Sequence, residues 1–191
     1  MGDPGTTGIN VLLLCTGNMC RSPVAEAFLR RKVDAAGRTD VRVSSAGLLE
    51  AGRAAPDDNV AVMTSWGIDL IDHRSRQIDA EMLAAADLVV AMAREHVREV
   101  VVNVPDAWPR TFTLREIVRR GEEVGRRTAG QPLDEWIAKV HAGRSPAMLV
   151  GSSSADDVAD PMGRSRKFYE AAAEEIEELV NRLYALVWGE Q

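Results

Sequence analysis

Cysteine and histidine are scarce in this chain of 191 residues, which holds two of the first and three of the second. Two cysteines are too few for a disulfide-stabilised scaffold, and the scattered histidines leave little for a zinc site. The free thiols suit a reducing compartment. We therefore expect a protein that needs no metal and no other cofactor.

Long hydrophobic runs and an excess of positive charge are also missing. The apolar run at 11–15 has the length of a strand, whereas roughly 20 residues are needed to cross a bilayer. The small, polar stretch 1–10 does not resemble a secretion signal, which predicts a cytoplasmic location. The net charge of −6 argues against a general nucleic-acid-binding protein. We expect neither a membrane nor a nucleic acid as partner, and a monomer is the default.

The remaining composition is that of an ordinary globular domain. Hydrophobic residues make up 46% of the chain and charged residues 27%, while aromatic residues contribute only 5%. This length suits one α/β domain and is too short for two full-sized ones. We expect residues 1–8 to form a flexible N-terminus and residues 9–191 to form a single domain.

Short apolar runs alternate with helical patterns along this domain. The predicted strands lie at residues 9–14, 41–44, 88–92 and 111–113. The predicted helices lie at residues 23–36, 57–66, 80–85, 94–102 and 165–188, and the first of them has Ser22 as its N-cap. This alternation predicts a three-layer α/β/α fold with a central four-stranded parallel sheet. Ligands bind beyond the carboxyl ends of such strands, and Cys15 lies at one of these ends.

The segment 115–157 differs from the rest because it is polar and rich in arginine. It holds two candidate helices, at residues 114–120 and 133–141, separated by predicted loops. We interpret it as a partly helical insertion packed on the domain, with a solvated surface. Alternatively, its arginines form a rim that steers anionic substrates toward Asp160, which follows the segment.

The most informative segment is 15–23, with the sequence CTGNMCRSP. A tight loop between a strand and a helix directs several backbone N–H groups inward, which makes an anion-binding nest. The N-terminus of the helix adds further donors and a partial positive charge. Arg21 can donate to two oxygens of one phosphoryl group. The segment therefore predicts a phosphate-binding loop after the first strand.

The same surroundings favour the thiolate form of Cys15, because positive charge stabilises the sulfur anion. A thiolate that faces a bound phosphoryl group is placed for nucleophilic attack, and the nest then stabilises the charge on the equatorial oxygens. This chemistry requires no metal. The alternative, an inert buried cysteine, does not explain why a loop, an arginine and a helix start follow it.

Four motifs together resemble those of the low-molecular-weight protein tyrosine phosphatases. Residues 11–15 and 21–26 resemble the signature of that family. The later motifs, in the order of the family, are Ser45-Ala46-Gly47, residues 67–70 with His73-Arg74-Ser75-Arg76-Gln77, and Asp160-Pro161-Met162-Gly163. The resemblance covers about 9–104 and 158–188 and leaves the predicted insertion unmatched.

The resemblance implies a role for each matching residue. Cys15 would be the nucleophile that forms a phosphocysteine intermediate, Arg21 would clamp the phosphoryl oxygens, and Asp160 would act as general acid and then as general base. The substrate would be a phosphotyrosine protein or a small phosphate ester. The substrate-binding loop would consist of Thr16, Gly17, Asn18, Met19, Cys20, Arg21 and Ser22.

The resemblance also implies roles around this loop. Ser22 would donate to the Cys15 sulfur, and Ser45 and His73 would hold Asn18 in its strained position. Cys20 would be either a redox partner that forms a reversible disulfide with Cys15 or a passive loop residue. The residue patterns alone give His96 no role, so we interpret it as a surface residue.

Two departures from the family leave the preference for phosphotyrosine open. Met162 replaces the aromatic residue that commonly follows the Asp-Pro pair, and the loop 48–55 lacks the aromatic residue often found there. One alternative function is arsenate reduction completed by an external small thiol, since no cysteine follows Cys20. Another is a non-catalytic phosphoprotein-binding module, although such a module needs neither a thiolate nor an acid.

Overall fold

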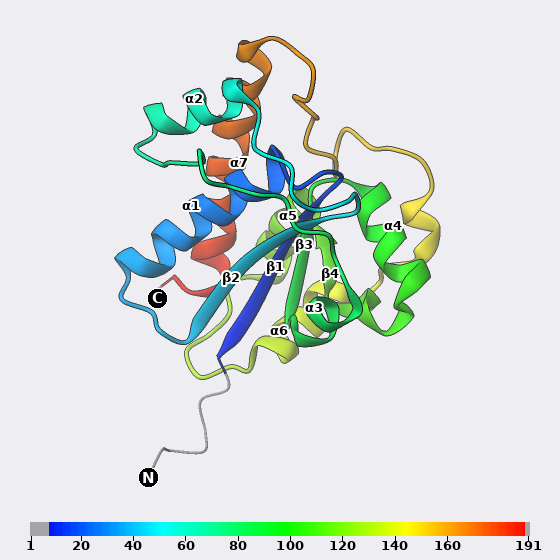
Figure 1. The fold of residues 1–191 in the computed structure, drawn as a ribbon. Helices are drawn as coiled ribbons and strands as arrows, with labels where there is room; N and C mark the ends of the chain where they lie inside the picture. Colours follow the sequence, from blue (N-terminus) through cyan, green and yellow to red (C-terminus); the bar gives the residue numbers. More distant parts are fainter. Residues whose placement is uncertain (1–7, 190–191) are drawn as a thin grey trace.

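A four-stranded parallel sheet forms the centre of the molecule, as the sequence predicts (Figure 1). The computed structural model describes residues 8–189, so the predicted flexible N-terminus lies outside the described residues except for Gly8. The strand order is β2-β1-β3-β4. The strands are β1 (Ile9–Cys15), β2 (Val41–Gly47), β3 (Leu88–Ala91) and β4 (Thr111–Thr113).

Helices cover both faces of this sheet, which makes the predicted three-layer arrangement. One face packs against α1 (Arg21–Ala35), α2 (Asp57–Ser65), α5 (Leu114–Val124), α6 (Leu133–His141) and α7 (Arg166–Val187). The other face packs against α3 (Ala80–Ala85), α4 (Arg94–Asn103) and the short 3₁₀ helices η1 (Pro105–Arg110) and η2 (Pro146–Leu149).

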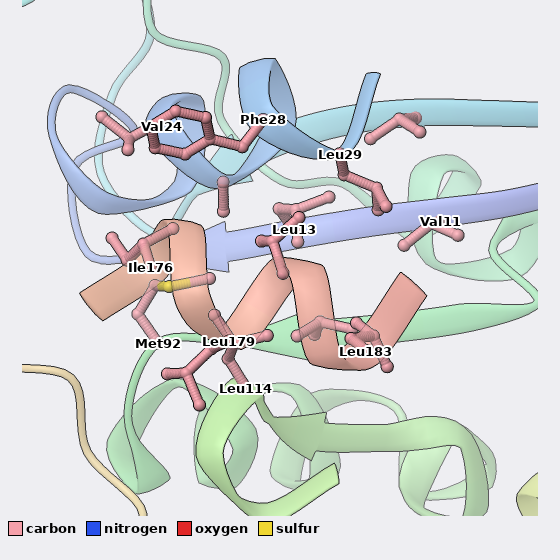
Figure 2. Close-up of a cluster of buried hydrophobic side chains, with 14 of the residues drawn as sticks. Val11, Leu13, Val24, Phe28, Leu29, Met92, Leu114, Ile176, Leu179 and Leu183 are labelled. Carbon is pink, nitrogen blue, oxygen red and sulfur yellow. The ribbon is translucent and has the colours of Figure 1, made fainter. Parts of the chain in front are cut away.

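The apolar run in β1 follows from this burial on both faces. Val11 and Leu13 point into the larger core, where Figure 2 shows Leu13 beside Leu29 of α1 and Leu179 of α7. Leu12 and Leu14 belong to the smaller core against α3 and α4. Because successive side chains of a strand point to opposite faces, the residues of a strand covered on both sides are mostly apolar.

No helix in the range 8–189 is long and apolar enough to span a bilayer.

The first helix begins earlier than the sequence predicts. We expected Ser22 as the N-cap, but α1 starts at Arg21 and its N-cap residue is Cys20, which makes no side-chain capping bond. The prediction is wrong because the Ser22 hydroxyl has other partners. It lies 3.0 Å from the Cys15 sulfur and accepts a hydrogen bond from Asn18.

Ion pairs hold the arginine-rich segment to the domain. The sequence predicts that the arginines of this segment are solvated, and this prediction is wrong for Arg144. The Arg144 side chain is fully buried and pairs with Glu116 at 2.7 Å. Its guanidinium also lies 3.8 Å from the ring centre of Trp108 and 4.0 Å from that of Phe112. Glu116 completes a capping box with Thr113 at the start of α5. The sequence therefore predicts an exposed Arg144, whereas residues distant in the sequence surround its charge and bury it.

Replacing Arg144 with methionine is expected to lower the free energy of unfolding by about 3–5 kcal/mol, because it leaves the buried Glu116 carboxylate without its partner. Urea unfolding measures the loss. The matched control is Arg182→Met, since Arg182 pairs with Glu122 on the exposed surface. That change is expected to cost no more than about 1 kcal/mol. Equal losses in the two variants would contradict a structural role for the buried pair.

Candidate active site

The loop between β1 and α1 wraps around the Cys15 sulfur. The backbone N–H of Asn18 donates to this sulfur at 3.3 Å, and the Ser22 hydroxyl lies 3.0 Å from it. Cys15 itself is buried, with 2% of its surface exposed. The structure therefore brings the predicted nucleophile and the predicted loop donors together.

Asn18 carries the backbone strain of the loop. Its φ of 50° is the only positive φ of a non-glycine residue in the range 8–189. Such a conformation persists only where the surroundings hold it. The Asn18 side chain donates to Ser45 at 2.7 Å and to Ser22 at 2.9 Å, and the backbone carbonyl oxygen of Asn18 accepts from His73 at 2.6 Å. Ser45 and His73 thus lie where the resemblance implies.

Gly47 and Glu26 support the same loop from behind, and the sequence analysis assigns neither of them a role. A Cβ atom at Gly47 would lie 2.7 Å from the backbone nitrogen of Asn18, so only glycine allows this close approach. Glu26 accepts a hydrogen bond of 2.5 Å from the Ser45 hydroxyl. Both residues lie inside motifs that resemble those of the family, which is the only sign in the sequence that they matter. Their contacts could not be predicted, because the residues they contact are distant in the sequence.

Arg21, at the start of α1, meets Asp160, which lies on the loop that precedes α7. The Arg21 guanidinium donates to the Asp160 carboxylate at 2.7 Å and to the Val158 carbonyl at 3.1 Å. The Asp160 side chain is 46% exposed, whereas that of Arg21 is 5% exposed. Both predicted residues therefore lie at one site, and Asp160 remains open to a ligand.

Two acidic residues near the end of the arginine-rich segment position the Asp160 loop. Asp156 pairs with Arg94 at 2.6 Å and with Arg119 at 2.9 Å, and the backbone N–H of Arg94 donates to Asp157. Burial opposes the ionisation of Asp156, but the hydrogen bonds and charges of Arg119 and Arg94 outweigh it and lower its pKa. These contacts attach the loop to α4 and α5.

A small cavity of about 90 Å³ lies at the centre of the site. Cys15, Arg21 and Asp160 form its polar end. Its remaining walls are largely apolar, because Met19, Leu49 and Met162 line them. Larger hollows of about 570 and 800 Å³ lie elsewhere, and neither is lined by a cysteine. The arrangement fits a compact anion against the sulfur and an apolar group toward the mouth.

Cys20 lies in the loop but differs from Cys15 in its surroundings. Burial, together with the charges of Asp160 and Cys15, raises the pKa of the Cys20 thiol to about 12. The thiol therefore stays protonated at neutral pH. This makes Cys20 a poor nucleophile, since the thiolate is the reactive form.

His96 does not lie on the surface, so the interpretation from sequence is wrong. Its side chain is fully buried, and its Nε2 atom lies 2.9 Å from the Thr16 hydroxyl. Burial, reinforced by the charge of Arg21, lowers the pKa of His96 from 6.5 to about 3. No local pattern predicts this contact, because Thr16 and His96 are 80 residues apart in the sequence.

This depressed pKa makes the stability of the fold depend on pH. Between pH 6.5 and about 3 the unfolded chain protonates His96 and the folded chain does not, so stability is lost as the pH falls through this window. The expected slope from this group is about 1.4 kcal/mol per pH unit. Urea unfolding at about pH 6.5 and pH 4.5 should therefore show a drop about 2–3 kcal/mol larger in the wild type than in His96→Gln. Equal drops would contradict a neutral, buried His96.

Known proteins resemble this chain in sequence and in fold. Residues 10–125, which include β4 and α5, match the family model of the low molecular weight phosphotyrosine protein phosphatases. The chain is 32% identical to a protein-arginine-phosphatase of Geobacillus stearothermophilus, over 95% of the chain and 97% of the relative. It is also 32% identical to a low molecular weight protein-tyrosine-phosphatase of Escherichia coli K12, over 59% of the chain and 74% of the relative.

The structural comparison extends over nearly the whole chain. The crystal structure of a low molecular weight protein tyrosine phosphatase from T. tengcongensis superimposes with a TM-score of 0.69 and 32% identity. The superposition covers 92% of this chain and 97% of the other. It therefore includes most of the arginine-rich segment as well as the four motifs.

Proposed function

The chain belongs to the low molecular weight phosphotyrosine protein phosphatase family, a family of cysteine-dependent phosphatases, and we propose that Cys15, Arg21 and Asp160 carry out its reaction. The observation that carries the proposal is their convergence on one cavity. Donors surround the sulfur of Cys15, Arg21 supplies a buried guanidinium, and Asp160 supplies an exposed carboxyl group.

In the first step, the Cys15 thiolate attacks the phosphorus atom of the substrate. The bond between phosphorus and the ester oxygen breaks, and Asp160 transfers its proton to the leaving oxygen. The product is a phosphocysteine at Cys15 and a free alcohol or phenol. Arg21 and the backbone N–H groups of the loop stabilise the negative charge on the equatorial oxygens during this transfer.

In the second step, a water molecule attacks the phosphocysteine. The Asp160 carboxylate now accepts the proton of that water, and the bond between phosphorus and sulfur breaks. Inorganic phosphate leaves, and the Cys15 thiolate and the protonated Asp160 return for the next cycle. One residue acts as acid and then as base, so the site needs no second titratable group.

The ion pair between Arg21 and Asp160 adds a condition to this cycle. Arg21 donates to the Asp160 carboxyl group, whereas the first step needs that group at the leaving oxygen. A phosphoryl group bound in the loop competes for the same Arg21 donors, since each guanidinium N–H prefers the more negative acceptor. Substrate binding therefore releases Asp160 from Arg21, and the released carboxyl group can turn toward the leaving oxygen.

The apolar mouth of the cavity favours an aryl phosphate, such as phosphotyrosine. Leu49 and Met162 are 42% and 40% exposed there, and their aliphatic side chains can pack on a phenyl ring. One relative is named a protein-arginine-phosphatase, and a guanidinium leaving group would be recognised best by a carboxylate. Asp160 is the only carboxylate among the described residues that line the cavity, and it serves as the acid.

Two peptides of one sequence, carrying either phosphotyrosine or phosphoarginine, test this preference. The kcat/KM for the phosphotyrosine peptide is expected to exceed that for the phosphoarginine peptide by at least about 10-fold, the usual effect of a mismatched group in an apolar pocket. The assay measures released phosphate with EDTA present. A higher kcat/KM for phosphoarginine would overturn the proposed substrate while leaving the chemistry of Cys15 intact.

The organisation and setting of the protein are part of the same proposal. Residues 9–191 form one phosphatase domain, in which the partly helical segment 115–157 packs on the rest and anchors the Asp160 loop through Asp156 and Asp157. All proposed catalytic residues come from one chain, which supports a monomer. The nucleophilic thiolate needs a reducing compartment, which supports the cytoplasm, and the substrate is a phosphotyrosine protein or a small phosphate ester.

A further inference from the structure

The Thr16 hydroxyl lies between two groups on different elements of the fold. His96 of α4 places its Nε2 atom 2.9 Å from the Thr16 oxygen, and Arg21 of α1 places an Nη atom 3.3 Å from it. An arginine side chain has only donors, so Thr16 accepts the hydrogen bond from Arg21. The direction of the bond with His96 then decides what the Thr16 proton can do.

The surroundings of His96 indicate that its Nε2 atom carries the proton. The Nδ1 atom is buried and has no partner among residues 8–189. Buried N–H groups without a partner are rarer than bare acceptors, which favours an unprotonated Nδ1. Nε2 also lies 3.5 Å from the Glu95 carboxylate, and this acceptor favours a proton on the facing nitrogen. The pKa of His96, lowered to about 3, leaves the ring neutral with that single proton.

A neutral His96 with its proton on Nε2 donates to Thr16. The Thr16 oxygen then accepts from both His96 and Arg21, which occupies both of its lone pairs. Its own proton must point elsewhere, and Thr16 has no other side-chain partner among the described residues. Thr16 is half-buried and lines the cavity with Cys15 and Arg21. The free proton is therefore available to a ligand in that cavity.

We infer that the Thr16 hydroxyl donates a hydrogen bond to a phosphoryl oxygen of the bound substrate, and that His96 is the positioning residue that directs this hydroxyl. The inference deepens the proposed function, on which it rests for the identity of the bound group. It adds one side-chain donor to a site otherwise built from backbone N–H groups and Arg21. It also gives the buried histidine a purpose, because a leucine in its place could not orient Thr16.

Inorganic phosphate is the probe for this donor, because its binding does not depend on turnover. Calorimetry is expected to show phosphate binding weakened roughly 10- to 100-fold in Thr16→Val, the usual effect of removing a hydrogen bond to a charged group. Thr16→Ser keeps the hydroxyl and should recover most of the affinity. Thr64→Val is the matched control, since Thr64 lies on the exposed face of α2, and it should bind phosphate like the wild type.

Unchanged phosphate affinity in Thr16→Val would overturn the inference. The kcat/KM for p-nitrophenyl phosphate, measured on the same samples, separates this failure from a failure of the proposed function. A wild type that binds phosphate but releases none from the ester would overturn the catalytic proposal. If the wild type hydrolyses the ester and Thr16→Val has the same phosphate affinity and the same kcat/KM, only the proposed role of Thr16 is overturned.

A double-mutant cycle tests the part of His96. His96→Leu is expected to weaken phosphate binding several-fold, and His96→Gln, whose amide can donate from a similar place, should recover part of the loss. In the Thr16→Val background, His96→Leu should cause no further loss, because the hydroxyl that it directs is gone. Additive losses would overturn the positioning role. If His96→Leu does not fold, His96→Asn replaces it, since its shorter side chain does not reach Thr16.

Discussion

Replacing Cys15 with serine is expected to lower kcat for p-nitrophenyl phosphate by roughly 10⁴- to 10⁶-fold, the range for removal of an enzyme nucleophile. A serine hydroxyl stays protonated at neutral pH and attacks phosphorus far more slowly than a thiolate. The serine fills nearly the same volume, so position 15 should keep its hydrogen bonds with the Asn18 N–H and the Ser22 hydroxyl. Steady-state kinetics with EDTA present measure the effect.

Binding of inorganic phosphate provides the control for this variant. Cys15→Ser should still bind phosphate, because the backbone donors and Arg21 remain in place. If Cys15→Ser lost both phosphate binding and turnover, the substitution would have disrupted the loop. The nucleophile would then be identified by trapping the phosphoenzyme. A folded, phosphate-binding Cys15→Ser that keeps more than about 1% of the activity would contradict Cys15 as the nucleophile.

Replacing Asp160 with asparagine is expected to slow the hydrolysis of phenyl phosphate by roughly 10²- to 10⁴-fold. Phenol is a poor leaving group, so its departure depends on a proton from the acid. Nitrophenol leaves readily as an anion, so the first step with p-nitrophenyl phosphate should slow much less. Single-turnover kinetics isolate this step, because they record release of the leaving group before the phosphocysteine is hydrolysed.

The dependence on the leaving group identifies the role of Asp160. Asp134→Asn is the matched control, since Asp134 is an exposed carboxylate in the first turn of α6, and its rates should equal those of the wild type. The Asp160→Asn change also removes a partner of Arg21, which alters binding of every substrate equally. Equal slowing of phenyl and p-nitrophenyl phosphate in the first step would therefore contradict Asp160 as the general acid.

Local signals in the sequence explain why much of the fold and site could be predicted. A strand segment buried on both faces is mostly apolar, and the run 11–15 in β1 shows this directly. The Cys15–Ser22 loop carries its chemistry within a few consecutive residues, so its donors and Arg21 could be recognised without a structure. Helix α6 matches its predicted bounds at residues 133–141, because its apolar residues recur at helical spacing.

Contacts between distant residues explain what the sequence could not predict. His96 follows the exposed Glu95 on α4, and nothing local reveals that its ring meets Thr16. The sequence around Arg144 is typical of a surface arginine, but Trp108 and Glu116 surround this side chain in the fold. In each case a polar group is buried because a partner from another element satisfies it, and such partners follow from packing.

Chemical trapping of the phosphoenzyme tests the central claim most directly. Asp160→Asn, mixed with p-nitrophenyl phosphate and quenched in acid within one turnover, should carry one added phosphoryl group on the peptide that contains Cys15. The variant suits the trap because it retains the nucleophile and lacks the base that hydrolyses the intermediate. A phosphoryl group on Cys15 is the predicted result. Turnover with no phosphorylated Cys15 peptide, or with the phosphoryl group on another residue, would contradict the account.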